Sequence, residues 1–459
     1  MKIHRLSGLD KGFLLLEGPS QPFHQCSLAE LDVSALPGGY SFEAIRDTLA
    51  ERVRALPEFR AKLADSRLNL GTPVWVEDAD FSIANHVRRM QVPDPGGPRE
   101  LSAIAADLAA TPMDRSRPLW DITVLEGISG KAPDENGRIA LFIRTHHIFA
   151  DGVSSGNMWA QLYADGDVAT PAQAEGFGMV DKRRIVLGGL AQFLGRPWFL
   201  VRTVLPESIV GIIRTLRRRG QGQVMSSLFV APPTPFNGDV SEQRDVAFAH
   251  LELSDVLAVK NKFGVKVNDV LAAIASGALR RYLAMEGALP TRSLIAVMPI
   301  SIYDESRDSR NQFSPMIASM HTDAEDPVDR LKAIAEASSI AKDHSSAIGY
   351  TLLLDWTQFA PSILKTIVRL FRRSGIGKRQ PIFNLSFSNV RGTQERILGA
   401  PIISNYPFGP VLTGVGLNIT VSTLNDSVDI GFVACPRLLP NVWDLADGAT
   451  IALKELLDA

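Results

Sequence analysis

Cysteine is scarce in this 459-residue chain, which holds only Cys26 and Cys435. Two cysteines so far apart in sequence predict neither a disulfide framework nor a cysteine-based metal site, and they favour a reducing, cytosolic setting. An excess of charge of one sign is also missing, because the formal net charge is −2. The sequence therefore offers no general electrostatic reason to bind nucleic acid.

Long hydrophobic runs are missing too. The apolar run at 12–16 is short and bordered by charged residues, which excludes a signal peptide. The longest stretch without charge, 397–425, contains Pro401, Pro407 and Pro410 and several glycines, which would repeatedly break a membrane-spanning helix. We therefore expect a cytoplasmic protein that is soluble or, at most, attached to a membrane surface.

Helix and strand patterns alternate along the chain, which predicts layered α/β domains. In 41–56, Phe42, Ile45, Leu49 and Val53 recur at spacings of three and four and predict an amphipathic helix. Further helices are expected near 101–108, at 153–163, from 268 onwards and at 327–342, and strands at 74–76, 118–126, 139–147, 293–302, 384–390, 416–423 and 428–433. With 45% hydrophobic residues, the chain is long enough for two domains rather than one.

A basic segment separates the two predicted domains, which we place at 1–180 and 240–459. Between 182 and 219 there are nine basic residues and one acidic residue, and Pro197 and Pro206 are expected to divide the segment into short helices. A basic amphipathic stretch fits an anionic membrane surface, and an ordinary linker packed on the body fits equally well. A second basic and apolar patch at 363–379 favours the membrane surface. The region 181–239 is thus predicted to be a crossover linker.

The stretch from Ile143 to Gly152 has the clearest chemical potential. A strand at 139–147 would place His147 on the face of Ile143 and Thr145, and His146 on the opposite face. A neutral imidazole at a strand end is a natural general base near pH 7, so His147 could take the proton of an alcohol whose oxygen then attacks a thioester. Asp151 could orient this imidazole, or it could hold the turn by pairing with one of three candidates, Arg115, Arg117 and Arg144. A buried, hydrogen-bonded histidine pair beside a turn is the structural alternative.

Two other chemistries share this stretch. Gly152-Val153-Ser154-Ser155-Gly156 matches the nucleophile elbow of serine esterases and lipases, which would also need an acid and a later histidine such as His250, His321 or His344. A metal site at His146, His147 and Asp151 is disfavoured, because adjacent strand residues point to opposite faces. We expect neither a metal nor a cofactor.

The motif His146-His147-x-x-x-Asp151-Gly152 resembles that of the CoA-dependent acyltransferase superfamily. The flanking sequence resembles the bacterial wax ester synthase/diacylglycerol acyltransferase family nearly from end to end. The blocks that carry this resemblance are 6–17, Pro118-Leu119-Trp120, Asn268-Asp269, Ser388-Asn389-Val390 and 416–420.

This resemblance implies a fold and a reaction. The fold would be two chloramphenicol-acetyltransferase-like domains with mixed sheets flanked by helices, and acyl-CoA and acceptor would meet at His147 in a tunnel between them. His146 would be structural or would shape the pocket, and Asp151 and Gly152 would hold the loop. A long-chain acyl group would pass from acyl-CoA to diacylglycerol or a long-chain alcohol. A non-catalytic lipid-binding protein of this fold is the remaining alternative.

The flanking motifs also have structural interpretations. Asn268 could line the tunnel, or Asn268 and Asp269 could cap a helix; Trp120 would pack in the core, and Asn389 could be a turn residue. Three positions depart from the family pattern: Arg391 stands where a proline is frequent, Cys435 where an acidic residue is usual, and Asn441 where an aspartate is usual. These departures leave acceptor preference and activity level open, but they do not touch the histidine motif.

Overall fold

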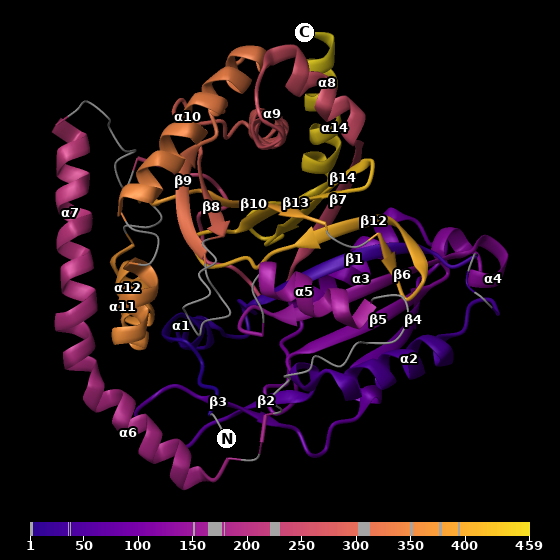
Figure 1. Ribbon diagram of the computed structural model, residues 1–459. Helices are drawn as coiled ribbons and strands as arrows, with labels where there is room; N and C mark the ends of the chain where they lie inside the picture. The colour runs from indigo at the N-terminus through magenta and orange to yellow at the C-terminus, as the bar shows by residue number, and fades with distance from the viewer. Residues whose placement is uncertain are drawn as a thin grey trace.

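The computed structural model describes residues 3–34, 36, 38–149, 152–163, 177–178, 180–220, 230–301, 313–348, 352–375, 379–392 and 395–459. Asp151 lies outside these residues. Two six-stranded sheets form the centre of the molecule, with helices packed around them. In Figure 1 most of the first 163 residues lie below, and most of the residues from 240 onwards lie above.

The first sheet has the strand order β11-β12-β1-β6-β5-β4, in which only β4 and β5 are parallel. Leu141 and Ile143 of β6 join one hydrophobic cluster and Phe142 joins another on the opposite face, which confirms the predicted alternation. The strands are β1 (His24–Asp32), β4 (Val87–Gln91), β5 (Trp120–Glu126), β6 (Arg138–His146), β11 (Arg396–Ile397) and β12 (Ala400–Phe408), and β2 (Ala61–Ala64) pairs separately with β3 (Val74–Glu77).

The second sheet has the order β7-β14-β13-β10-β8-β9, and β10 is parallel to both of its neighbours. Both sheets are therefore mixed and flanked by helices, which confirms the predicted fold class. The strands are β7 (Asp245–Glu252), β8 (Ile295–Ser301), β9 (Phe313–Ser319), β10 (Leu385–Arg391), β13 (Leu417–Leu424) and β14 (Ser427–Ala434).

Helices cover the outer faces of both sheets. The Ser41 side chain accepts a hydrogen bond from Ala44 and begins α2, and Asp326 accepts from the N–H of Val328 at 2.9 Å and begins α10. These helices confirm the ones expected at 41–56 and 327–342. The helices are α1 (Gly8–Leu16), α2 (Phe42–Ala55), α3 (Pro98–Ala110), α4 (Pro133–Asn136), α5 (Gly152–Tyr163), α6 (Lys182–Phe199), α7 (Leu205–Gly220), α8 (Leu253–Phe263), α9 (Val267–Met285), α10 (Pro327–Ile348), α11 (Leu352–Phe359), α12 (Pro361–Ser374) and α14 (Trp443–Asp458).

The C-terminal half of the chain contributes strands to the first sheet. β12 follows β10 in sequence, yet it pairs antiparallel with β1 of the first sheet, with Cys26 opposite Phe408. The two sheets also approach closely, because a Cβ atom at Gly431 of β14 would lie 1.9 Å from the carbonyl oxygen of Pro407. The boundaries at 180 and 240 stay a prediction, and β12 shows that the first sheet is not built from the N-terminal half alone.

The prediction of short helices between 182 and 219 is wrong. α6 continues through Pro197 into a π-helical segment, η4 (Leu200–Val204), and α7 follows directly. Figure 1 shows them as one long rod in magenta along the left edge. η4 precedes Pro206, and the wider π-helical turn makes room for the ring of Pro206, which would clash with a regular preceding turn. Within the described part of the chain, no helix combines the length and apolar character that a bilayer crossing requires.

Candidate active site

The two histidines lie at the end of β6, in a turn that two other segments hold. The backbone N–H of His146 donates to the carbonyl of Leu119 at 3.0 Å, and the N–H of His147 donates to Phe23 at 2.8 Å. The turn closes where the N–H of Phe149 donates to the carbonyl of His146 at 2.8 Å. The segments that lead into β1 and β5 therefore fix the backbone of each histidine.

The side chain of His146 is completely buried. Its Nδ1 accepts a hydrogen bond from the N–H of Ile148 at 3.2 Å, and its Nε2 lies 3.2 Å from Oε1 of Glu17, just after α1. Burial alone would raise the pKa of Glu17, but its interactions with His146 and Arg115 prevail and lower the pKa to about 2. Because Nδ1 accepts, a neutral His146 carries its proton on Nε2, facing an ionised carboxylate.

His147 is half-buried and turns the other way. Its ring centroid lies 4.9 Å from that of Phe13 on α1, and its Nε2 lies 3.4 Å from the side-chain amide nitrogen of Gln25 on β1. The predicted separation of the two imidazoles is thus confirmed. Partial exposure gives His147 the access to a substrate proton that a general base needs.

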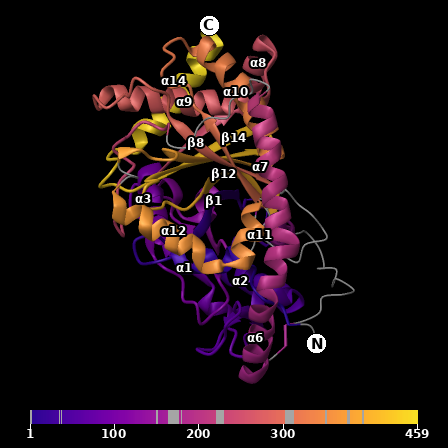
Figure 2. The same cartoon turned by 90° about the vertical axis from the view of Figure 1, so that its left-hand side faces the viewer.

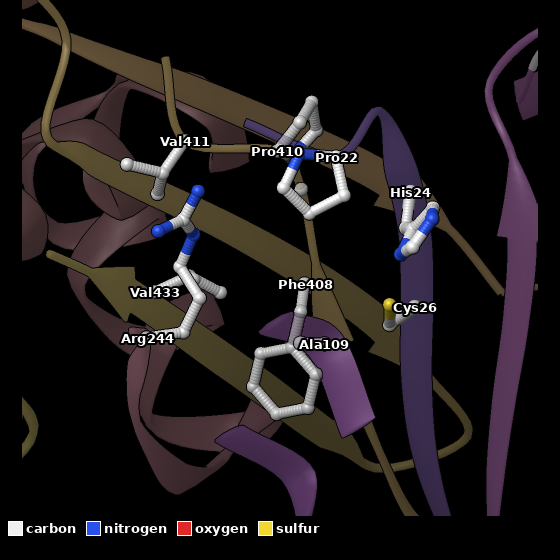
Figure 3. A pocket seen from close by; sticks show the side chains of 10 residues that line it. Pro22, His24, Cys26, Ala109, Arg244, Phe408, Pro410, Val411 and Val433 are labelled. Atoms are coloured by element: carbon white, nitrogen blue, oxygen red, sulfur yellow. The ribbon is translucent and has the colours of Figure 1, made fainter. Parts of the chain in front are cut away.

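A narrow cavity lies beside the pair, where the two sheets meet. Its wall includes His24, whose ring centroid is 6.1 Å from that of His146 across β1 and β6. Figure 3 shows His24, Phe408 and Arg244 around this cavity, which has room for about one water molecule. Burial, together with Arg144 and His146, lowers the pKa of His24 to about 3, so this imidazole is neutral at physiological pH. The cavity is too small for an acyl chain, and the substrate tunnel stays a prediction.

The three arginines expected as partners of Asp151 have carboxylate partners elsewhere. Arg144 donates to Asp121 through Nε at 2.8 Å and through Nη2 at 2.6 Å. The other two pairs are Arg115 with Glu17 and Arg117 with Asp114. Asp151 itself lies outside the described residues, so both of its possible roles stay predictions.

The described residues give no support to a serine triad. Ser154 lies near the start of α5, where no side chains are described. His250 is paired with Asp429, with 2.7 Å between Nδ1 and Oδ1, and the other Asp429 oxygen accepts from the N–H of Asn405. Asn405 pairs with β1 five residues beyond its histidine end, or about 17 Å along the strand. His250 is thus remote from the residues that follow His147.

The Pro118-Leu119-Trp120 motif is part of the core. Trp120 is 1% exposed, its Nε1 donates to the carbonyl of Phe59 at 2.8 Å, and its ring stacks on His86. The carbonyl of Leu119 accepts the hydrogen bond from the N–H of His146 in the histidine turn. The motif therefore packs in the core and helps to hold the histidine turn in place.

Asn268 and Asn389 meet, although 121 residues separate them. The side-chain amide of Asn389, near the end of β10, donates to Oδ1 of Asn268 at 2.6 Å, in the first turn of α9. The side chain of Asp269 instead accepts from the N–H of Lys266 at 3.0 Å and caps the same helix. The sequence points to all three side chains, but it does not predict that two of them form a pair.

The three departures from the family pattern lie in or near the second sheet. Arg391 is exposed at the end of β10, and the buried Cys435 sulfur accepts from the N–H of Ser241 at 3.3 Å. Asn441 has a φ of 55°, a left-handed conformation that asparagine tolerates better than most residues. These contacts involve neither histidine of the motif.

Comparison with protein families matches two long segments. Residues 6–271 match the wax ester synthase/diacylglycerol acyltransferase catalytic domain, and residues 310–457 match the WS/DGAT C-terminal domain. The chain belongs to the wax ester synthase/diacylglycerol acyltransferase family. It is therefore an acyltransferase, and the resemblance in its motifs is confirmed.

Relatives and solved structures agree with this assignment. A Mycobacterium tuberculosis H37Rv protein provisionally named diacylglycerol O-acyltransferase is 43% identical over 461 residues, covering 99% of this chain and 90% of its own. The wax ester synthase/diacylglycerol acyltransferase from Marinobacter aquaeolei VT8 superposes with a TM-score of 0.71 at 25% identity, covering 98% of both chains. The first condensation domain of the calcium-dependent antibiotic synthetase shares the fold, with a TM-score of 0.59 at 16% identity over 99% of this chain and 96% of that one.

Proposed function

We propose that this acyltransferase moves a long-chain acyl group from acyl-CoA to diacylglycerol, giving triacylglycerol, or to a long-chain alcohol, giving a wax ester. The observation that carries the proposal is the single half-buried imidazole of His147, turned away from its buried neighbour, in a chain of this family. The names of the mycobacterial relatives support diacylglycerol, and the name of the Marinobacter protein covers both acceptors.

His147 is the general base of this reaction. Its imidazole removes the proton of the acceptor hydroxyl while that oxygen attacks the thioester carbonyl. The tetrahedral intermediate collapses as the carbon–sulfur bond breaks, and the CoA thiolate takes the proton back from the imidazolium. The acyl group passes directly between the substrates, so no acyl-enzyme forms and no further cofactor is required.

Substitution of the base tests this mechanism. His147→Ala should lower the rate of CoA release from oleoyl-CoA and diacylglycerol by about 10²- to 10⁴-fold. His250→Gln, which changes a half-exposed histidine remote from the motif, should retain the activity. Near-full activity of His147→Ala would contradict the mechanism.

Two further assays separate the alternatives. If Ser154→Ala abolished ester hydrolysis while His147 were dispensable, the protein would be a serine esterase. If the protein bound lipids but released no CoA with a panel of acyl-CoA donors and alcohol acceptors, it would be a lipid-binding member of the fold.

We also propose that the rod formed by α6, η4 and α7 binds an anionic phospholipid surface, on a membrane or a lipid droplet. The inner face of α6 is lined by Ile185, Gly189 and Gln192 at helical spacing, and it contacts Arg5 and the segment 69–72. Large apolar side chains instead point outwards, at Leu187, Leu190, Phe193, Leu194, Trp198, Val201, Leu205, Ile209, Val210, Ile212 and Ile213. A packed linker would turn its apolar face inwards, whereas an exposed apolar stripe of this length is typical of a binding surface.

Positive charge accompanies this stripe. Lys182, Arg183, Arg184 and Arg202 are exposed along it, and such residues are attracted to anionic lipid headgroups. Figure 2 faces this side of the molecule and shows α12 in front together with α6 and α7. α12 adds exposed apolar side chains at Ile367 and Leu370. The two basic patches of the sequence therefore share one face.

Vesicle binding tests this surface. The protein should sediment with phosphatidylserine-containing liposomes but not with phosphatidylcholine liposomes, and salt should weaken the binding. Charge reversal at Arg217, Arg218 and Arg219 or Trp198→Ser should weaken it further, while Leu68→Ser, at an exposed leucine outside the rod, should not. Unchanged liposome binding in the charge-reversed variant would show that the rod is only a linker. A dimer that Trp198→Ser dissociates, without liposome binding, would assign the stripe to a second copy of the chain.

A further inference from the structure

The last turn of α1 reaches both histidines of the motif. Phe13 and Glu17 are four residues apart, so they lie on the same side of the helix. The ring of Phe13 packs on His147, and the carboxylate of Glu17 lies 3.2 Å from Nε2 of His146. The N–H of Glu17 also donates to the carbonyl of Phe13 at 2.9 Å, which ties the two contacts together.

One oxygen of Glu17 contacts His146 directly and is linked to His147 through Phe23. Oε1 faces the His146 side chain and also accepts from the N–H of Phe23 at 3.4 Å. The carbonyl of Phe23 in turn accepts from the N–H of His147 at 2.8 Å. Arg115 pairs with the other oxygen of Glu17. A single carboxylate is therefore connected to the imidazole of one histidine and, through one residue, to the backbone of the next.

We propose that Glu17 is a positioning residue for the transfer reaction, which it serves by fixing the His146 ring and, through it, the turn that presents His147. The inference rests on the proposed role of His147 as the base. His146 accepts at Nδ1 from the N–H of Ile148, so the orientation of its ring sets the backbone on the far side of His147. Without Glu17, the buried Nε2 of His146 would lose the carboxylate that lies 3.2 Å away, which favours a rotated ring and a displaced turn.

Charge gives the proposal a second consequence. Glu17 is ionised at every pH at which the enzyme works, because its pKa lies at about 2. Among the described residues, Arg115 pairs with Glu17, His24 on β1 faces the His146 ring, and Arg144 on β6 acts electrostatically on His24. Removal of the negative charge of Glu17 makes protonation of the nearby His147 less favourable. The acid limb of the pH–rate profile should then move to lower pH.

Two substitutions separate the geometry of Glu17 from its charge. Glu17→Ala should lower kcat about 10- to 100-fold, with the KM for oleoyl-CoA changed less than about 2-fold, because the base is misplaced. Glu17→Gln keeps an acceptor oxygen, so kcat should fall less and the acid limb should shift. Glu126→Gln is the matched control, because Glu126 is a carboxylate at the far end of β5 that accepts from the Tyr40 hydroxyl at 2.6 Å. It should change neither kcat nor the pH profile.

The outcome decides the proposal in each case. A fall in kcat that only follows the loss of folded protein, with the acid limb unmoved in Glu17→Gln, would overturn it, as would unchanged kcat in Glu17→Ala. His147→Ala, assayed in parallel, reports on the proposed function itself. If that variant stays active, NMR of histidine-labelled protein still decides the role of Glu17. An Nε2–H signal of His146 that is protected from exchange in wild type and lost in Glu17→Ala supports positioning, and an unprotected signal in wild type refutes it.

Discussion

A single guanidinium fixes three elements beside the histidine pair. Arg144 of β6 lies opposite Asp121 of β5 in the strand register and forms two hydrogen bonds with it. Its Nη1 also donates to the carbonyls of Leu108 and Thr111 at the end of α3. Two-point recognition of a carboxylate and of helix-end carbonyls suits the planar fork of arginine. The side chain is 4% exposed, so its positive charge depends on these partners.

Loss of the Asp121 carboxylate, which neutralises Arg144, should lower the free energy of unfolding. Asp121→Asn leaves a buried cation only partly compensated, and the free energy of unfolding in urea should fall by about 3–5 kcal/mol. The exposed pair of Arg117 and Asp114 is the control, because Asp114→Asn should cost about 0–1 kcal/mol. Equal effects of the two substitutions would contradict the structural role of Arg144.

His250 should make stability depend on pH. Its hydrogen bond to the fully buried Asp429 raises the pKa of His250 above the ordinary 6.5, and burial only partly opposes this. A raised pKa in the folded state means that the protonated form is stabilised. This stabilisation is fully present below pH 6.5 and is lost as the pH rises through the raised value. The urea midpoint should therefore fall between pH 6 and 9, and a fall of equal size in His250→Gln would contradict this assignment.

At the scale of the element, α1 depends on a glycine. A Cβ atom at Gly8 would lie 2.2 Å from the carbonyl oxygen of Thr357 in α11, and the N–H of Gly8 donates to the Gln358 side chain at 2.6 Å. The two helices therefore touch backbone to backbone, which only glycine permits. The position of Phe13 and Glu17 beside the histidines depends on this contact.

Gly8→Ala should displace α1 and affect the site at a distance. The overpacked contact should cost about 1–3 kcal/mol of unfolding free energy, and kcat should fall as Phe13 and Glu17 move. Gly18→Ala is the control in the same segment, because a Cβ there meets nothing within 4 Å. Urea denaturation and the CoA-release assay measure the two effects. Wild-type kcat in a destabilised Gly8→Ala would separate α1 from catalysis.

Elements with strong periodicity can be predicted from the sequence, and the others cannot. The helix at 41–56 and the strand at 139–147 are observed as α2 and β6, because their apolar spacings match one repeat only. The sequence does not predict β12, because Pro401 and Pro407 are unusual in strands. β11 pairs only with the first two residues of β12, so most of β12 forms ladder hydrogen bonds with β1 alone. A strand with a neighbour on one side tolerates proline.

The candidate site can likewise be predicted from the sequence only in part. The period of two predicts that His147 and His146 point in different directions. β6 ends at His146, so the turn that follows, held by the hydrogen bond from His147 to Phe23, also determines the direction of His147. Glu17 stands out in the sequence only as part of the opening segment shared with the family. Its contact with His146 arises from packing of α1 against the end of β6, and no local spacing encodes such a long-range contact.

At the scale of the whole molecule, the contact between the sheets depends on Gly431. A side chain there would meet the backbone of Pro407 and the ring of Phe408, which would lie 2.7 Å from the added atom. Gly431→Ala should therefore separate the sheets and lower the unfolding free energy by about 1–3 kcal/mol or more. Gly195→Ala, in open space on α6, should leave stability nearly unchanged. A wild-type urea midpoint for Gly431→Ala would show that the sheets can move apart without cost.

The place of β12 in the first sheet also determines the order in which the sheets assemble during synthesis. Until Phe408 has been made, β1 is the outermost strand of its sheet and its free edge has no ladder partner. An open edge of this kind invites pairing with other chains. In a nascent polypeptide, the sheet that carries the histidines therefore stays unfinished until β12 has left the ribosome. The first sheet to be translated is thus completed only shortly before the second, whose last strand β14 ends at Ala434.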